Sequence, residues 1–248
     1  MIKILTFSRL YPNEIQPQNG IFVEQRLRKL LETNQVQTRV IAPVPWFPFK
    51  SDRFNTYGEA ARVARRETRY GIEVLHPRFP HIPKYGMTLS PFLLAGAMTR
   101  EVRSLLKSGF DFQLIDAHYF YPDGVAAAIL GKIFNKPVTI TGRGSDINLI
   151  SQFSLPRRLI CWAAHRSAAV ITVSEALKDK LAALNISKDH ITVLRNGVDL
   201  DLFSPVSRGS VISRLGLNGP IALSVGNLVE EKGHDITISA LQYLPDLT

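Results

Sequence analysis

The chain has 248 residues, 45% of them hydrophobic, which is enough to bury one full core and to begin a second. A lone cysteine, Cys161, excludes a disulfide framework and a cysteine-based zinc site. Every apolar run is interrupted before it reaches membrane-spanning length. The whole net charge of +9 lies in residues 1–110, which hold 17 Lys+Arg and 8 Asp+Glu. These features predict a globular cytoplasmic protein whose first half attracts anions.

Apolar runs that resemble strands alternate with helical patterns, which is typical of a parallel α/β sheet. We therefore expect a Rossmann-like parallel sheet with helices on both faces and a ligand site beyond the C-terminal ends of the strands. The expected strands are 2–7, 37–42, 72–75, 112–117, 138–141, 169–173 and 191–194. The expected helices are 22–31, 91–107, 124–134, 156–165 and 175–183.

The loop after the first strand holds Tyr11 and ends in Asn19 and Gly20, where the first helix begins. Asn19 can cap that helix, and Gly20 lets a phosphate or another backbone segment come close. A simple loop with a good cap is the alternative. The dinucleotide fingerprint G-x-G-x-x-G is absent, which argues against an NAD dehydrogenase.

Residues 43–69 show no regular pattern but combine several aromatic residues with four arginines. If the segment is helical, Arg62, Arg65, Arg66 and Arg69 lie on one face and form a basic stripe that suits an anionic membrane. The alternative, which we slightly favour, is a solvated helix face with the aromatic side chains packed inward.

His118 directly follows the expected strand 112–117, at the edge of the sheet that faces ligands. A hydrogen-bonded structural histidine is the alternative, but this placement favours a catalytic role. The six histidines include no pair spaced for metal ligation. Asp199 and Asp201 can chelate a divalent metal, but the preceding Asn-Gly favours a turn, so we expect no metal.

The expected strand 138–141 ends in a short loop that contains Arg143 between two glycines, followed by Asp146. The glycines allow a sharp turn that points the guanidinium into a cleft, where it suits a phosphate or sugar hydroxyls. Asp146 either holds a substrate hydroxyl or forms an ion pair with Arg143 that stiffens the loop. The sequence supports both equally.

Near the end of the chain, apolar residues 221–225 break at Gly226 into a polar loop that contains Lys232. A helical pattern over residues 234–244 follows. This order predicts the first strand–loop–helix unit of a second Rossmann-like domain. Because such a loop points backbone amides outward beside a lysine, it suits a diphosphate.

Five short motifs follow one another in a specific order: Phe7-Ser8-x-x-Tyr11-Pro12 with Gly20-Ile21-Phe22-Val23, His118-Tyr119-x-x-Pro122-Asp123-Gly124, Thr141-x-Arg143-Gly144-Ser145-Asp146, Val173-Ser174, and Asn196-Gly197-Val198-Asp199 with Phe203 and Pro205. Together they resemble the family-4 group of retaining glycosyltransferases, which use nucleotide sugars and have two Rossmann-like domains in the GT-B fold. Within this group the chain is most similar to bacterial enzymes of exopolysaccharide, lipopolysaccharide and teichuronic acid assembly.

The resemblance implies a catalytic site at the edge of the first domain. It implies that His118 contacts the transferred sugar and that Tyr11, Arg143 and Asp146 lie near the acceptor. Family members usually work without a metal, so the resemblance implies no cofactor. The implied partners are a nucleotide-sugar donor and a saccharide or lipid-linked acceptor. The basic first half adds an anionic membrane surface as a partner, and no sequence motif indicates binding of nucleic acid.

The resemblance also implies a donor site made of two loops. The loop of Asn19 and Gly20 approaches the donor diphosphate, while Gly226, Asn227 and Lys232 neutralise the diphosphate that leaves. Many relatives have arginine where Asn227 stands, so one of the two usual cations is missing here.

The implied organisation is that of an incomplete enzyme. Residues 1–205 form the acceptor-side domain, 206–220 a linker, and 221–248 the truncated start of the nucleotide-sugar domain. The nucleotide-binding glutamate motif of the family is expected beyond residue 248, so we expect this chain alone to transfer no sugar. The enzyme is expected to act as a peripheral protein at the inner face of the cytoplasmic membrane. The alternative is a non-catalytic binding or scaffold module with a basic, membrane-facing surface.

Overall fold

The computed structural model describes residues 1–81, 86–216 and 220–244. The chain divides into two compact units, Met1–Gly197 and Val198–Thr248. This division comes earlier in the chain than residue 205, where the sequence suggested the end of the first domain.

An eight-stranded sheet forms the centre of the first unit, in the order β10-β9-β8-β7-β1-β2-β5-β4. A separate two-stranded sheet pairs β3 with β6. The strands are β1 (Ile2–Phe7), β2 (Val36–Ile41), β3 (Val44–Pro45), β4 (Arg66–Arg69), β5 (Ile72–Leu75), β6 (Arg78–Phe79), β7 (Leu114–His118), β8 (Val138–Gly142), β9 (Ala169–Thr172) and β10 (Ile191–Val193). All seven strands expected in this unit are confirmed, with ends within two residues of the predicted ones.

The large sheet is mixed and not wholly parallel. Its edge strand β4 runs antiparallel to β5, whereas every other neighbouring pair is parallel. Tyr70 and Gly71 connect β4 to β5, and both have positive φ, 49° and 78°. Two such residues form the tight turn that joins antiparallel strands.

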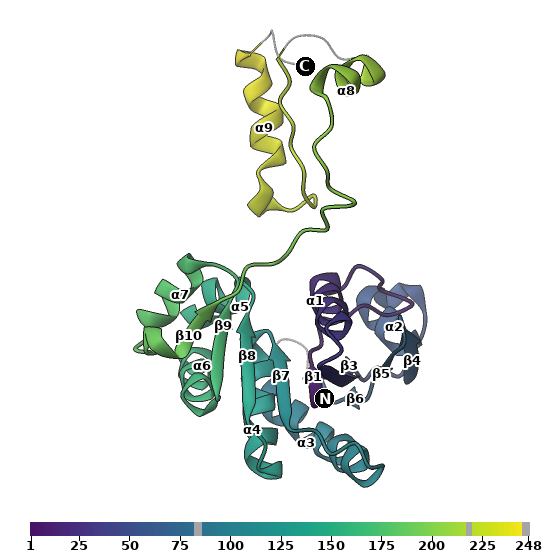
Figure 1. Ribbon diagram of the computed structural model, residues 1–248, viewed down its shortest axis with the longest axis vertical. Helices are drawn as coiled ribbons and strands as arrows, with labels where there is room; N and C mark the ends of the chain where they lie inside the picture. Colours follow the sequence, from purple (N-terminus) through teal and green to yellow (C-terminus); the bar gives the residue numbers. More distant parts are fainter. Residues whose placement is uncertain (82–85, 217–219, 245–248) are drawn as a thin grey trace. The chain divides into compact units, whose positions relative to one another are not determined.

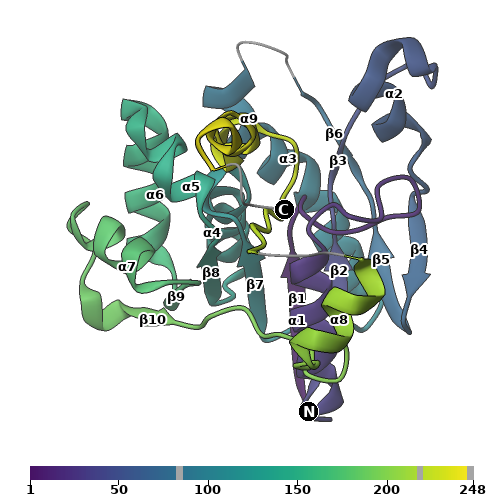
Figure 2. The same ribbon diagram turned by 90° about the horizontal axis from the view of Figure 1, so that it is seen from above.

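Helices cover both faces of the sheet, so the α/β prediction is confirmed. They are α1 (Ile21–Glu32), α2 (Asn55–Arg62), α3 (Gly86–Lys107), α4 (Val125–Phe134), α5 (Ser145–Asn148), α6 (Ser154–Arg166) and α7 (Glu175–Ala182). Seen from above, α1 lies on one side of the row of strands and α3, α4 and α6 lie on the other (Figure 2). All five helices expected in this unit are confirmed.

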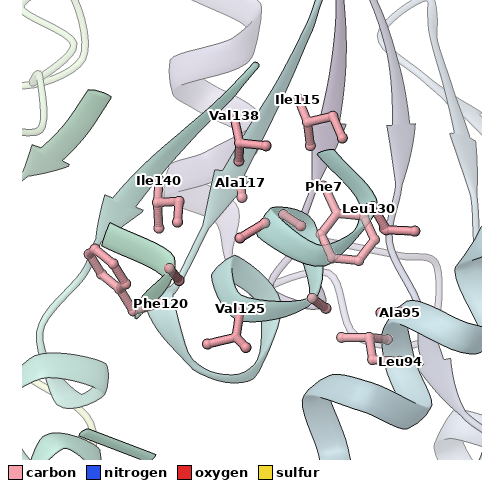
Figure 3. Packing of buried hydrophobic residues seen from close by; sticks show 14 of the residues in the cluster. Phe7, Leu94, Ala95, Ile115, Ala117, Phe120, Val125, Leu130, Val138 and Ile140 are labelled. Carbon is pink, nitrogen blue, oxygen red and sulfur yellow. The ribbon is translucent and has the colours of Figure 1, made fainter. Parts of the chain in front are cut away.

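The face under α3, α4 and α6 carries the main hydrophobic core. Because side chains alternate along a strand, every second residue of β1, β7 and β8 points to this face. Figure 3 shows the packing of Phe7, Leu94, Ala95, Ile115, Ala117, Phe120, Val125, Leu130, Val138 and Ile140. Most of these side chains are completely buried, so this layer supplies much of the hydrophobic stabilisation of the fold.

The strand order places the switch point of the sheet between β1 and β7. From β1 the chain passes to β2 on one side and later returns to β7 on the other side (Figure 1). Open α/β sheets bind ligands at the C-terminal ends of the strands beside such a point. The loops that follow β1 and β7 both begin there.

The segment 43–69 is more regular than its sequence suggests, because it contains β3, α2 and β4. The helix on which the basic stripe depended does not form: Arg62 ends α2, whereas Arg66 and Arg69 lie on β4, so the four arginines share no helix face. The expected inward packing of the aromatic residues is also wrong for several of them, which are exposed.

The described part of the second unit includes the α-helices α8 (Arg208–Leu215) and α9 (His234–Ala240). Residues 221–225 form no strand there, contrary to the sequence-based expectation. A parallel strand needs a neighbour for its backbone groups, and the described part of this unit holds no other strand to pair with. None of its described side chains is buried.

No described helix is both long enough and apolar enough to cross a membrane.

Candidate functional site

The central strands carry polar side chains on the face that α1 covers. Asp116 and His118 lie two residues apart on β7 and therefore point to the same side. The parallel register places them opposite Thr139 and Thr141 of β8. Polar groups thus replace the apolar layer beside the switch point, where a ligand site is expected.

The His118 ring is enclosed by protein groups and is only 1% exposed. Its Nε2 lies 3.2 Å from Oδ2 of Asp116. Its Nδ1 lies 2.8 Å from Nη2 of Arg143 and 3.5 Å from Nη1 of Arg26. Because a guanidinium can only donate, Nδ1 must accept, which leaves the proton on Nε2 facing the carboxylate. Burial lowers the pKa of this histidine, so the ring is neutral.

This geometry corrects one expectation about His118. The ring does not face an open groove, because Arg26 of α1 and Arg143 lie against it. Both ring nitrogens already have protein partners, so neither is available to exchange a proton with a substrate here. Its contact with the transferred sugar remains a prediction.

Asp116 anchors the buried end of this network. It accepts a hydrogen bond from Thr139 Oγ1 at 2.9 Å in addition to its contact with His118. Burial by itself raises the pKa of the carboxyl, but the hydrogen bonds from His118 and Thr139 and the positive charge of Arg26 lower it below its usual range. The carboxylate is therefore charged and fixes the orientation of the histidine.

Arg143 lies at the C-terminal end of the β8 region and is partly exposed. Its Nη1 donates to Asn196 Oδ1 at 2.9 Å, its Nη2 donates to His118, and its guanidinium lies 4.7 Å from the centre of the Phe22 ring. Burial, followed by the nearby positive charge of Arg26, lowers the pKa of Arg143 to about 10. The group stays charged near neutral pH and is held on three sides.

The Asp146 side chain binds the backbone around the end of β8 and does not reach the surface. Its carboxylate is buried and accepts hydrogen bonds from the backbone N–H groups of Phe120, Arg143 and Gly144 at 2.7, 3.0 and 2.8 Å. The expectation that it meets the acceptor is therefore not supported. The stiffening of the loop is observed, but the contact goes to the backbone of Arg143 and not to its guanidinium.

The loops after β1 and β7 are joined at the switch point. Ser8 Oγ donates to the carbonyl of His118 at 3.3 Å, and Arg9 Nε pairs with Asp123 Oδ1 at 2.9 Å. Burial raises the pKa of Asp123 although Arg9 opposes that shift. The two loops therefore form one continuous edge.

Gly20 stands at the start of α1 in a conformation that only glycine adopts readily. Its φ is 68°, and a Cβ added there would lie 2.2 Å from the Leu10 carbonyl oxygen. The backbone of the loop therefore passes very close to Gly20. Asn19 does not cap α1 as expected, because its side chain donates to the Arg9 carbonyl at 3.2 Å.

Tyr11 lies in the core and not at a surface that an acceptor can reach. Its side chain is fully buried against Val23 and Leu27 of α1 and Val40 of β2. Burial strongly raises the pKa of its hydroxyl. The assignment of Tyr11 to acceptor binding is therefore not supported.

The second unit brings two of the expected donor residues together. A Cβ added at Gly226 would meet Lys232 Cγ at 3.2 Å and His234 Nε2 at 3.4 Å, so the lysine stem lies against the glycine. The Lys232 side chain is exposed. The carbonyl of Asn227 accepts a hydrogen bond from Val229 within the same loop.

The pair Asp199 and Asp201 forms a turn. Oδ1 of Asp199 accepts from the backbone N–H groups of Asp201 and Leu202 at 3.1 and 3.2 Å. Within the described residues, no three histidine, cysteine, aspartate or glutamate side chains gather closely enough to hold a metal ion.

Sequence reasoning missed Arg26, Asp116, Asn196 and Arg9 as parts of the site. The signal for Asp116 was available, because it is a charged residue inside an apolar strand and lies two positions before His118. Arg26 lacked such a signal, since it looks like one of several polar residues on an amphipathic helix. Only the fold brings it to His118, 92 positions later in the chain.

Comparisons with known proteins agree with this architecture. The sequence profile of Glycosyltransferase Family 4 matches residues 78–202, half of the chain. The chain is 28% identical to TuaC of Bacillus subtilis, a glycosyltransferase named for teichuronic acid biosynthesis, over 99% of this chain and 63% of that protein. It is 27% identical to an uncharacterized glycosyltransferase of Methanocaldococcus jannaschii, over 71% of this chain and 45% of that protein.

A solved structure shows the same fold. Anabaena HepE in complex with UDP-glucose aligns with a TM-score of 0.60 at 20% identity, over 100% of this chain and 59% of that chain. At that identity the likeness concerns the fold alone. The chain spans less than two thirds of the length of each of these three relatives.

Proposed function

Because this chain belongs to glycosyltransferase family 4, we propose that its protein transfers a sugar from a nucleoside-diphosphate donor to a saccharide or lipid-linked acceptor. The fold likeness to a protein solved with UDP-glucose makes UDP-sugars the first donors to test. Because one relative is named for teichuronic acid biosynthesis, a polysaccharide is the first acceptor to test. Retention of the anomeric configuration is proposed from the family.

The observation that carries the proposal is the network of Asp116, His118, Arg143 and Arg26 at the switch point. It fixes two guanidinium groups at the C-terminal edge of a sheet whose fold suits ligand binding there. Breaking a sugar–phosphate bond leaves negative charge on the nucleotide. Positive groups that are already held in place stabilise such charge without reorganising during the reaction.

We assign His118 a positioning role within this site. Its Nδ1 accepts from Arg143, and its Nε2 contacts a charged carboxylate. A ring held in this way orients the guanidinium and does not need to transfer a proton. Arg143, which is partly exposed, is the member of the network placed to meet a substrate.

On the donor side, we propose that Lys232 and the Gly226 loop contact the diphosphate, together with the Asn19–Gly20 loop. The exposed ammonium of Lys232 can approach a ligand, and the lack of a side chain at Gly226 lets the lysine stem lie against the backbone. We propose no metal and no further cofactor for this step.

We further propose a cytoplasmic protein that works peripherally at the inner face of the membrane, because a lipid-linked acceptor is presented there. The basic first half supports this location, since anionic lipids attract such a surface. We also propose that the 248-residue chain alone transfers no sugar. Its second unit buries none of its described side chains and therefore offers no formed domain to hold a donor.

The test uses the full-length protein with a panel of nucleotide sugars, UDP-glucose first, and oligosaccharide or membrane-extract acceptors. We expect donor-dependent release of the nucleoside diphosphate and incorporation of the labelled sugar into the acceptor. Replacing Lys232 with alanine is expected to lower the rate about tenfold or more. Replacing Lys180, an exposed lysine on α7, is expected to leave it unchanged.

Binding of nucleotide sugars without transfer to any acceptor would contradict the proposal and support the non-catalytic module. If transfer occurs, NMR of the product anomer decides the stereochemistry. Retention is expected, and inversion would overturn that part of the proposal.

A further inference from the structure

A cluster of aromatic rings stands on the surface of the first unit, in residues 46–57, which run from the end of β3 into the start of α2. We call this segment the aromatic loop. Its rings contact one another, with centroid distances of 5.1 Å for Phe47 and Phe54, 5.3 Å for Phe49 and Phe54, and 5.4 Å for Phe47 and Tyr57. Even so, Trp46 is 58% exposed, Phe49 56% and Phe54 40%.

The aromatic loop has a defined shape that its own contacts maintain. Ser51 accepts from the backbone of Arg53 and Phe54, and Asp52 forms an ion pair with Arg62 at the end of α2. A Cβ added at Gly58 would lie 2.2 Å from the Ser51 carbonyl oxygen, so the loop folds tightly against the helix. The rings of Phe47, Phe49, Phe54 and Tyr57 are therefore held against one another, which lowers the entropy lost when a partner binds them.

The charges around the rings are mainly positive. Lys50 and Arg53 are exposed within the loop, and neither has an ion-pair partner among the described residues. Of the two acidic residues nearby, Asp52 pairs with Arg62, and Glu59 accepts a hydrogen bond from the neutral amide of Gln16 and keeps its charge. The surface thus offers apolar rings beside two cations that have no ion-pair partner among the described residues.

We propose that the aromatic loop is the surface through which this protein docks on an anionic lipid bilayer. Tryptophan and phenylalanine with flanking lysine and arginine form the composition that favours the membrane interface, where rings enter the headgroup layer and cations meet lipid phosphates. The excess charge of the first half adds long-range attraction to anionic lipid.

The inference places the membrane contact that the proposed function requires on a definite segment. It also replaces the arginine stripe that the sequence suggested. Arg62 pairs with Asp52, Arg66 with Glu73 and Arg69 with Glu24. These three guanidinium groups therefore form ion pairs within the protein. The aromatic loop instead combines unpaired cations with exposed apolar surface.

Trp46 provides a direct probe of docking, because the chain has only two tryptophans. In a Trp162→Phe variant, the 248-residue chain is mixed with vesicles of phosphatidylcholine alone, or with about a third phosphatidylglycerol. We expect the Trp46 emission to shift to shorter wavelength, and brominated lipid to quench it, with the anionic vesicles only. Raising the salt from about 0.1 M to about 1 M should weaken binding, because it screens the cations.

Two triple variants separate the loop from general surface hydrophobicity. The first replaces Trp46, Phe49 and Phe54 with serine. The second replaces three similarly exposed residues elsewhere in the unit, Ile133, Leu149 and Phe153, with serine. In vesicle co-sedimentation with native tryptophans otherwise kept, we expect the loop variant to lose at least about tenfold in partitioning, since three apolar side chains no longer leave water. The control variant should partition like the wild type.

Three outcomes would overturn the proposal. These are no binding of the wild type to anionic vesicles at low salt, an equal loss in both triple variants, or a Trp46 emission that does not change on binding. Circular dichroism of each variant checks that it is folded. Vesicle binding requires no sugar transfer, so a failed vesicle test with intact transfer removes only this inference. Bound vesicles without transfer would remove only the proposed function.

Discussion

The two faces of the central sheet differ in what the same strands place on them. On one face, Phe7, Ile115 and Ile140 are fully buried in a continuous apolar layer. On the other, Asp116 and His118 occupy the intervening positions of β7 and contact each other, and His118 also contacts an arginine from α1. A strand therefore alternates between residues that stabilise the fold and residues that form a polar network.

The comparison shows why the polar face is a better guide to function than the apolar one. Burying a charged carboxylate, a histidine and parts of two guanidiniums is unfavourable unless each has partners. The chain supplies those partners, yet an apolar filling of similar volume would be at least as stable. Retaining ionisable groups in this position is expected where their orientation matters for a ligand.

The largest expected effect comes from breaking the apolar face. Replacing Phe7 with alanine leaves a cavity in the layer shown in Figure 3, and we expect a loss of about 3–5 kcal/mol in the free energy of unfolding. Urea denaturation of the chain measures this loss. A loss below about 1 kcal/mol would mean that this face is not the main source of stability.

A smaller loss is expected at the start of α1, the helix that covers the polar face. Gly20→Ala combines a positive φ with a Cβ 2.2 Å from the Leu10 carbonyl oxygen. Gly109→Ala is the matched control, because Gly109 has a φ of 86° but nothing within 4 Å of its added Cβ. We expect the control to lose about 1–2 kcal/mol of stability from backbone strain and Gly20→Ala to lose clearly more. Equal losses in urea denaturation would show that the close approach is absent.

The pH dependence of stability tests the buried histidine. The pKa of His118 is lowered from 6.5 by burial, so below about pH 6.5 the unfolded state binds a proton that the folded state does not. Stability should therefore fall by up to about 1.4 kcal/mol per pH unit as pH drops from about 6.5 towards 5. His118→Gln should reduce this slope. An unchanged slope in the His118 variant would place the ring in contact with water.

Much of the first unit could be predicted from sequence because its strands are short apolar runs that alternate with amphipathic helices. The strand β4 was missed for a physical reason. Arg66 and Arg69 make β4 look polar, and only its position at the sheet edge, paired with β5, accounts for a strand there. Residues 221–225 were taken for a strand because they are apolar, but a strand also needs a neighbour.

The candidate site was predicted only in part. His118 and Arg143 were found because each follows a buried strand, and the structure brings them together. Tyr11 and Asp146 were assigned to the acceptor from the family resemblance, whereas the structure buries both side chains. The direction of a loop side chain depends on contacts made by distant parts of the chain, which local sequence does not contain.

The central claim is that the network on the polar face holds Arg143 in place for sugar transfer. The most direct test is the transfer rate of the full-length enzyme with Arg143→Lys, measured beside its stability. Lysine keeps the charge but cannot contact Asn196 and His118 with one planar group, so we predict a fall in kcat of about a hundredfold with little change in unfolding free energy. A rate equal to that of the wild type would contradict the account.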